Sequence, residues 1–364
     1  MRGVTYRGPS SVEVRSVPDA ALPDEHGAVV AVDLAGICGS DLHIYAGHGF
    51  SPDTGYCLGH EAVGRVVELG RAVTGLAVGD RVLVAASVGC AFCAECRRGR
   101  VSRCAAPPVA AGTVACYGLS HALPGSQAEA VAVPHAATNL IPVPDGLSDE
   151  DAVVLTDNAP TAWYGARRAR IQPGDSVVVV GLGPVGLMCI QAAYALGAAR
   201  VFGMDKVPDR RDRAAAMGAE PVAPPEGPDP DRGSAAKAGK EAKAAIRAAT
   251  GGGADVALEA VGADASIDLA IGAVRTGGRV SVVGVSQNKA FPLHMPAAQV
   301  RELEFAIGLC SVQYELPTLL ALTAAGRLRP AEVVTHRLPL SEAAEGYRLM
   351  STRSAGVSKV VLTP

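Results

Sequence analysis

The chain of 364 residues has a net charge of −3, with 49% hydrophobic, 19% charged and only 4% aromatic residues. This length exceeds that of most single cores, so we expect two domains that fold without disulfide bonds. The slight negative charge argues against a nucleic-acid partner, whose binding needs a broad positive surface.

The N-terminal segment MRGVTYRGPSSVEV lacks the apolar core of a signal peptide. We therefore expect a cytoplasmic protein, in which thiols stay reduced. In that compartment closely spaced cysteines bind metal or do chemistry more often than they form disulfides.

Short valine-rich segments separated by glycine and proline fill the chain up to about Pro144. Stretches such as AVGRVVELG and GDRVLVAASVG predict a compact antiparallel or barrel-like β domain with few helices. Two segments of this region, AGICGSDLH and LGHEAVG, are rich in polar residues within an otherwise apolar sequence. They contain Cys38, Ser40, Asp41, His43, His60 and Glu61. Cysteine and histidine are good zinc ligands, but two such residues do not make a site by themselves.

Four cysteines follow in the segment GCAFCAECRRGRVSRC with the spacing C-x2-C-x2-C-x7-C. They are Cys90, Cys93, Cys96 and Cys104. The spacing is compatible with a zinc site, an iron–sulfur cluster, disulfides or a nucleic-acid-binding finger. A ferredoxin-type cluster would need a shorter last gap and a following proline, whereas Ala105 follows Cys104. Four interleaved arginines can offset thiolate charge, namely Arg97, Arg98, Arg100 and Arg103.

Strand-like and helix-like segments alternate from about Ser148 to Val285, which predicts a parallel sheet with crossover helices. The apolar run from Val177 to Ala199 is long enough to cross a membrane. Its glycines and proline predict a buried strand, a turn and a buried helix instead, so we expect no membrane partner.

The hexapeptide GLGPVG has the pattern G-x-G-x-x-G directly after the strand-like SVVVV, and an acidic residue, Asp205, follows about twenty residues on. Gly181 permits the tight turn, Gly183 lets the backbone approach a diphosphate, and Gly186 allows the helix to pack on the strand. The diphosphate would lie at the helix N-terminus. The expected cofactor-binding residues are Gly181, Leu182, Gly183, Pro184, Val185, Gly186, Asp205 and Arg210.

The acidic residue Asp205 bears on the choice of cofactor. Its carboxylate would accept hydrogen bonds from the adenosine ribose and repel a 2′-phosphate, which favours NAD over NADP. Arg210 and Arg211 lie near enough in sequence to leave NADP open.

The rest of the chain offers fewer motifs. The segment from Pro221 to Ser234 is rich in proline, glycine and charge, which predicts a mobile surface loop. After Val285, LPTLLALTAAGRL and SEAAEGYRLM predict helices, a helix is expected from Ile267 to Val274, and VSKVVLTP predicts a final strand.

The motifs ICGSDLHIYAG, GHEAVG, the four-cysteine segment and GLGPVG, in this order, resemble the zinc-dependent alcohol dehydrogenases of the medium-chain dehydrogenase/reductase superfamily. LTDNAPTAWYGARRARIQPGD, MDKVPDRR and THRLPLSEAAEGYRLM are most similar to the bacterial branch related to formaldehyde and threonine dehydrogenases. The resemblance covers essentially the whole chain and implies an α/β fold. It implies a GroES-like, β-rich catalytic domain from residues 1–155 and 301–364, with a zinc-binding lobe at about 88–106. Residues 156–300 would form a Rossmann NAD-binding domain with a doubly wound parallel sheet.

The resemblance also implies a catalytic zinc held by Cys38, His60 and a third residue, which is cysteine in many relatives. No cysteine occurs between Cys116 and Cys189. The matching segment LTDNAP offers Asp157, and the resemblance to the branch that uses aspartate implies this residue as the third ligand.

Further roles are implied by position in the same motifs. Glu61 would lie beside the metal and exchange with its water, and Asp41 would orient the ligating histidine. The four cysteines would hold a second, structural zinc, which makes two zinc ions per chain.

The implied reaction passes a hydride between an alcohol, or the matching aldehyde or ketone, and NAD(H), with zinc as Lewis acid. The proton would leave through Ser40, a ribose hydroxyl and His43. Because relatives form dimers or tetramers, we expect a homodimer or homotetramer.

Two other functions stay open at this point. One is a zinc-free reductase of the same superfamily acting on an enone or quinone, against which Cys38, His60 and the cysteine segment argue. The other is a non-catalytic nucleotide-binding protein, against which the intact Ser40, His43 and Asp157 argue. The substrate beyond a small-molecule alcohol or carbonyl is not indicated by the sequence.

Overall fold

The computed structural model describes residues 1–106, 114–223, 232–286 and 288–364. The chain divides into two compact units, Met1–Pro160 with Cys310–Pro364, and Thr161–Leu309. The central part of the predicted loop at 221–234 lies outside the described residues.

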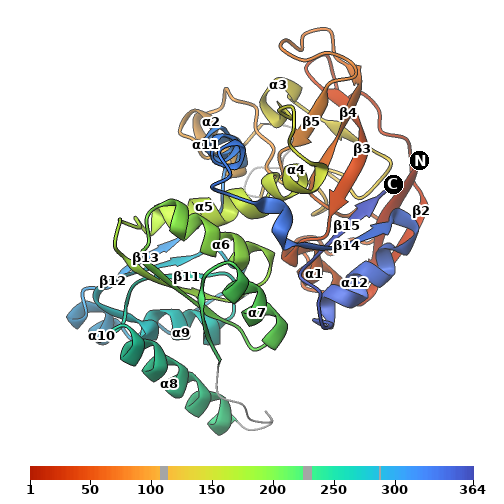
Figure 1. Cartoon of the computed structure of the whole chain (residues 1–364). Coiled ribbons are helices and arrows are strands. Elements are labelled where there is room, and N and C mark those ends of the chain that lie inside the picture. The colour runs from red at the N-terminus through yellow and green to blue at the C-terminus, as the bar shows by residue number, and fades with distance from the viewer. Residues whose placement is uncertain (107–113, 224–231, 287) are drawn as a thin grey trace. The chain divides into compact units, whose positions relative to one another are not determined.

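The first unit is built on a mainly antiparallel sheet of seven strands in its described part (Figure 1). Only β14 and β15 pair in parallel, and β6 joins the sheet beside β3. The other pairings follow the order β14 (Val334–Pro339), β15 (Lys359–Thr363), β3 (Ala28–Gly36), β4 (Glu61–Leu69), β5 (Arg81–Val84) and β7 (Leu140–Pro142), with β6 at Ala130–Val133. A separate hairpin is formed by β1 (Arg2–Gly8) and β2 (Ser11–Ser16).

Short helices interrupt this β-rich unit more often than the sequence predicts. They are α1 (Gly39–Tyr45), α2 (Ala94–Arg97), α3 (Ala136–Asn139) and α4 (Asp149–Leu155), and α5 (Asn158–Arg168) begins in this unit. The C-terminal segment adds α11 (Val312–Ala324) and α12 (Ala343–Ser351). The helices of fewer than eight residues are too short to show a 3.6-residue hydrophobic period, which is why the sequence pattern misses them.

The strand register brings three distant segments to one end of this sheet. Gly36, at the end of β3, is paired with Glu61, at the start of β4. The same glycine is paired with Val361 of β15, the last strand of the chain. The residues just after β3, at the start of β4 and at the start of β15 therefore lie close together.

The second unit is a parallel sheet of six strands in its described part, in the order β10, β9, β8, β11, β12, β13. In chain order this is 3-2-1-4-5-6, which is the strand order of a dinucleotide-binding sheet. The strands are β8 (Ser176–Val180), β9 (Arg200–Met204), β10 (Glu220–Val222), β11 (Ala254–Glu259), β12 (Val274–Val282) and β13 (Glu304–Ile307). The predicted α/β fold, with a β-rich unit and a doubly wound parallel sheet, is confirmed.

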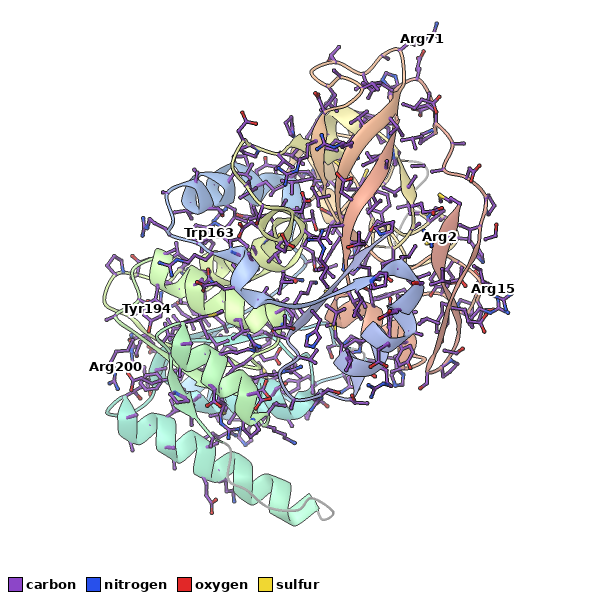
Figure 2. The ribbon with its side chains drawn as sticks, turned by 45° about the vertical axis from the view of Figure 1, so that its right-hand side comes forward. Arg2, Arg15, Arg71, Trp163, Tyr194 and Arg200 are labelled. Carbon is purple, nitrogen blue, oxygen red and sulfur yellow. The ribbon has the colours of Figure 1, made fainter. Side chains whose placement is uncertain are left out.

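Helices connect the strands of the parallel sheet. They are α6 (Pro184–Ala195), α7 (Pro208–Ala216), α8 (Arg232–Ala249), α9 (Asp264–Ala273) and α10 (Met295–Val300). Tyr194 of α6 donates a 2.5 Å hydrogen bond to the carbonyl of Gly218, and Arg200 pairs with Glu220 of the neighbouring strand. Figure 2 labels Tyr194 and Arg200 in this unit. The apolar run from Val177 to Ala199 forms β8, a turn and α6, and in the described chain no helix is both long and apolar enough for a membrane span.

Asp255, near the start of β11, forms hydrogen bonds with residues at the start of two other strands, Ser176 of β8 and Arg275 of β12. Its Oδ2 accepts hydrogen bonds from the Ser176 backbone and hydroxyl at 2.8 and 2.7 Å, and its Oδ1 accepts one from Arg275 Nε at 2.8 Å. Burial raises the pKa of Asp255, but these hydrogen bonds lower it by more, so it lies below its ordinary value of 3.8.

The lowered pKa of Asp255 makes the stability of this unit pH-dependent. Because the folded-state pKa is below that of the unfolded chain, the carboxylate stabilises the fold above the unfolded pKa, and this contribution is lost as pH falls through the folded pKa. We expect Asp255→Asn to lower the free energy of unfolding at pH 7 by less than about 1 kcal/mol, since the group is partly solvated. Urea unfolding should show a smaller difference between variant and wild type at pH 3, and a difference independent of pH would exclude the ionised carboxylate as its source.

Candidate metal and nucleotide sites

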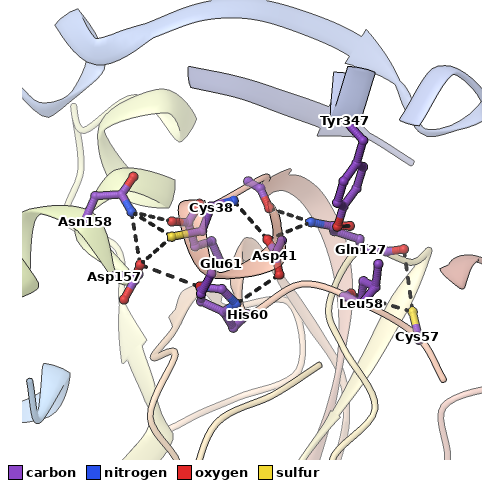
Figure 3. A network of polar contacts seen from close by, with 12 residues as sticks. Cys38, Asp41, Cys57, Leu58, His60, Glu61, Gln127, Asp157, Asn158 and Tyr347 are labelled. Atoms are coloured by element: carbon purple, nitrogen blue, oxygen red, sulfur yellow. Dashed lines mark hydrogen bonds and ion pairs between the residues drawn. The ribbon is translucent and has the colours of Figure 1, made fainter. Parts of the chain in front are cut away.

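Four side chains with metal-binding atoms converge at the end of the antiparallel sheet where β3 finishes and β4 begins (Figure 3). Cys38 is the N-cap residue of α1, and His60 and Glu61 stand at the start of β4. Asp157 lies between α4 and α5. One ligand atom of each lies within 4.8 Å of the others. The structure thus brings the predicted ligands together, with Glu61 beside them.

The donor set and its geometry fit a zinc ion. Asp157 Oδ2 lies 3.2 Å from Cys38 Sγ and 3.6 Å from His60 Nε2. A thiolate, an imidazole and a carboxylate are all common zinc ligands, and catalytic zinc sites use three protein ligands. His60 turns its Nδ1 toward Asp41 Oδ1 at 3.4 Å, an orientation that leaves Nε2 for a metal.

Protons and a metal ion compete for the side chains of this cluster. Burial raises the pKa of the Cys38 thiol, and the Asp157 carboxylate raises it further. Burial lowers the pKa of His60, but the charge of Asp41 and hydrogen bonds to Asp157 and Asp41 raise it well above its usual range. Burial raises the pKa of Asp157, but the hydrogen bond and charge of His60 lower it by more. Since ligands bind metal in deprotonated form, occupation of this site releases protons.

A series of buried, hydrogen-bonded side chains extends from the Nδ1 side of His60 (Figure 3). Asp41 Oδ2 accepts hydrogen bonds from the Cys38 backbone at 2.9 Å and from Gln127 Nε2 at 3.2 Å. Gln127 Oε1 accepts a 2.8 Å hydrogen bond from the hydroxyl of Tyr347, on α12. Asp41 was expected from the sequence, but Gln127 and Tyr347 were not. The only sequence signal for Gln127 is an amide among small residues in GSQAEAV.

Ser40 and His43 lie three residues apart on α1 and therefore on the same side of that helix. Ser40 Oγ is 3.2 Å from His60 Nε2, so its hydroxyl lies at the metal-binding cluster. Burial, together with the charge of His48, lowers the pKa of His43.

The four cysteines of the predicted lobe form a second cluster, again with ligand atoms within 4.8 Å of one another. Cys90 Sγ and Cys96 Sγ are 3.9 Å apart. Two thiolates on one tetrahedral zinc are expected about 3.8 Å apart, given Zn–S bonds of about 2.3 Å. Backbone N–H groups of Ala105 and Cys96 lower the pKa of Cys93 to about 6, so the local backbone already favours the thiolate.

The arginines of this lobe do not all face the thiols. Arg98 and Arg100 both pair with Glu95, with N–O distances of 3.0 Å. The lobe also contacts the C-terminal segment: Ser102 N lies 3.4 Å from Ser311 Oγ, and a Cβ added to Gly99 would lie 2.9 Å from the ring of Tyr314.

In the parallel-sheet unit, each glycine of the GLGPVG turn has a separate structural reason. Gly181 directly follows β8 and has a φ of +90°, a backbone conformation that residues with a side chain rarely adopt. A Cβ on Gly186 would lie 1.8 Å from the carbonyl oxygen of Gly181, so only glycine lets α6 approach the strand. A Cβ on Gly183 would meet nothing nearer than Arg210 Nη1 at 4.0 Å, which leaves its backbone open to a ligand.

Asp205 follows β9 and faces this turn. Its Oδ2 accepts a 2.8 Å hydrogen bond from Leu182 N, and its Oδ1 accepts one of 2.9 Å from Val207 N. Arg210 Nη1 lies 3.6 Å from Asp205 Oδ2, whereas Arg211 donates to the backbone carbonyls of Asp205 and Lys206. The structure thus gathers the expected cofactor-binding residues at the end of β8 and β9.

Comparisons with known proteins cover both units. Residues 24–145 match the family described as "Alcohol dehydrogenase GroES-like domain" and residues 184–325 match "Zinc-binding dehydrogenase". A probable zinc-binding alcohol dehydrogenase of Mycobacterium tuberculosis is 40% identical over 364 residues, which cover 100% of this chain and 89% of that protein. The alcohol dehydrogenase TADH from Thermus sp. ATN1 is 38% identical with a TM-score of 0.88, covering 100% of this chain and 99% of that one. A glutathione-independent formaldehyde dehydrogenase of Pseudomonas aeruginosa is 38% identical over 230 residues, 60% of this chain and 57% of that protein.

Proposed function

The chain belongs to the zinc-dependent alcohol dehydrogenases of the medium-chain dehydrogenase/reductase superfamily, and we propose that Cys38, His60 and Asp157 hold its catalytic zinc while NAD accepts the hydride. The β-rich unit is then the catalytic domain and the parallel-sheet unit the nucleotide-binding domain. The observation that carries the proposal is the convergence of a thiol, an imidazole and a carboxylate from three separate segments within 4.8 Å.

The residues around this cluster have distinct roles in the proposed reaction. Zinc, when bound, supplies a Lewis acid that favours ionisation of a substrate hydroxyl. Cys38 and Asp157 balance the charge of the ion, and Asp41 orients His60. Ser40, whose Oγ lies 3.2 Å from His60 Nε2, would take up the substrate proton while giving up its own hydroxyl proton. His43, on the same side of α1, would be the base that finally receives a proton.

Metal content and turnover together test this function. Elemental analysis of the purified protein should give two zinc ions per chain, and a screen of alcohols with NAD should produce NADH absorbance. One zinc per chain that is lost with a Cys93→Ser variant but kept with Cys38→Ser would mean that the catalytic site takes no metal. Reduction of enones without zinc would instead support the zinc-free reductase.

The preference for NAD is supported by the surroundings of Asp205. Each of its oxygens accepts one backbone hydrogen bond and keeps a lone pair for a ribose hydroxyl. Arg211 donates to two backbone carbonyls, whereas Arg210 lies 3.6 Å from Asp205 and its buried Nε has no hydrogen-bond partner in the described chain. A 2′-phosphate would meet the carboxylate of Asp205, which disfavours NADP.

We expect Asp205→Ser to raise the KM for NAD by roughly 10- to 100-fold, because hydrogen bonds to a charged acceptor are lost. The KM for NADP should fall, since the repulsive charge is removed. Steady-state kinetics with both cofactors measure the ratio, and Asp212→Ser, at an exposed position of α7, is the matched control. An unchanged NAD-to-NADP ratio would remove Asp205 from cofactor selection.

A homodimer or homotetramer is the proposed assembly. β13 is the edge strand of the parallel sheet and leaves Phe305 and Ile307 43% and 57% exposed. An edge strand with exposed apolar side chains favours pairing with a second chain. Sedimentation of the wild type against an Ile307→Lys variant tests this surface.

A further inference from the structure

Glu61 is among the four potential metal ligands, yet both of its oxygens already have partners (Figure 3). Oε1 accepts a 2.7 Å hydrogen bond from Asn158 Nδ2. Oε2 forms an ion pair with Lys359 Nζ, from the first residue of β15. The side chains of Glu61 and Lys359 are both 0% exposed, so bulk solvent does not reach the charge of this lysine.

The backbone around this ion pair leaves room for it only because Gly36 lacks a side chain. A Cβ added to Gly36 would lie 1.8 Å from Glu61 Oε2 and 3.1 Å from Lys359 Nζ. Gly36 lies in the regular strand β3 and has no positive φ, so backbone strain does not explain the glycine. The close approach of the buried ion pair does.

The charges of the proposed zinc site agree with the pairing of Glu61 with Lys359. The thiolate of Cys38 and the carboxylate of Asp157 neutralise a divalent cation, and Lys359 neutralises Glu61. If Glu61 also bound the metal, the lysine would lose its partner in a region that bulk solvent does not reach, where an unpaired charge is strongly unfavourable.

We propose that Lys359, Asn158 and Gly36 form a clamp that keeps Glu61 off the catalytic zinc, so that the fourth coordination position stays open. This proposal replaces the expectation from the resemblance that Glu61 exchanges with the water of the metal. Three protein ligands with an open position define a catalytic zinc site, whereas four ligands close it. The clamp is a positioning device that acts through Glu61 and touches neither substrate nor cofactor. It rests on the zinc site proposed above.

The clamp is tested with Co²⁺ in place of zinc and imidazole as a probe of the open position. Imidazole should shift the visible absorption of the cobalt wild type, and only the open site contributes because a four-cysteine site is closed. In Lys359→Met, released Glu61 takes the fourth position, and the apparent affinity for imidazole should fall at least about tenfold. Lys289→Met, an exposed lysine of the other unit, is the matched control.

A double variant separates the clamp from general damage. Lys359→Met with Glu61→Gln removes both buried charges, and the remaining amide is a poor zinc ligand, so imidazole affinity should return to within about threefold of the wild type. Asn158→Leu removes the hydrogen bond to Glu61 together with the contacts of Nδ2 to Cys38 Sγ and Asp157 Oδ2. It should weaken imidazole binding even if Lys359→Met does not fold, and adding Glu61→Gln should restore the binding if Glu61 is the cause. Imidazole binding that is unchanged in Lys359→Met and Asn158→Leu overturns the clamp. An imidazole-dependent shift of the cobalt spectrum that survives Cys38→Ala overturns the proposed zinc site itself, because the four-cysteine site gives no such shift.

Discussion

Replacing Cys38 with alanine is expected to remove the catalytic zinc and to lower kcat/KM by at least about a thousandfold, because a Lewis acid contributes several kcal/mol to such reactions. Cys38 supplies the thiol of this cluster, and without it His60 and Asp157 are one ligand short of a catalytic zinc site, because Glu61 is held by Lys359 and Asn158. Elemental analysis should fall from two zinc ions per chain to one, and steady-state kinetics should give the loss of activity.

The matched control is Cys57→Ala, which removes another buried thiol from the same unit. Cys57 Sγ lies 3.8 and 3.7 Å from the backbone carbonyl oxygens of Leu58 and Gln127, and Cys57 belongs to neither metal-binding cluster of the described chain. This variant should keep two zinc ions and activity within a fewfold of the wild type. A Cys38→Ala protein that retains both zinc ions would mean that the metal is held elsewhere.

Much of the fold could be predicted because its signals are local. The alternation of strands and helices and the GLGPVG turn predict the parallel sheet, and the structure gives it the expected strand order. The elements that escaped prediction are short or lie at an edge. β13 has four residues, and α10 has six residues, none of them buried. Neither length shows a clear hydrophobic period, so only the packed structure reveals them.

In the candidate site, residues that stand in local sequence motifs could be predicted, and contacts between distant residues could not. Cys38, His60 and the four cysteines stand in compact motifs, and Asp157 follows from the missing cysteine in its segment. Lys359 lies 298 residues from Glu61, and no local pattern predicts that they meet. Their contact depends on the register by which β15 joins β3, which is a property of the tertiary fold.

Replacing Cys93 with serine is expected to act on stability and not on the chemistry. The lobe has little regular structure, only the four-residue α2 and a three-residue turn of 3₁₀ helix at Val101–Arg103. We therefore expect a bound metal to contribute much of the stability of the lobe. Binding of a structural zinc contributes directly to folding. We expect the loss of one zinc ion per chain and a fall in Tm of roughly 10 °C or more, since each kcal/mol shifts Tm by about 2–4 °C in domains of this size.

The contrast with Cys38→Ala makes this prediction specific. Cys38→Ala should abolish activity while Tm stays within a few degrees, whereas Cys93→Ser should lower Tm while the folded fraction keeps the catalytic zinc. Arg103→Ser is the matched control, because it removes an exposed charge from the same lobe and leaves every thiol in place. Because the lobe also contacts α11 through Ser102 and Gly99, its loss should expose that helix to proteolysis. A Cys93→Ser protein with wild-type Tm and two zinc ions would show that this cluster binds no structural metal.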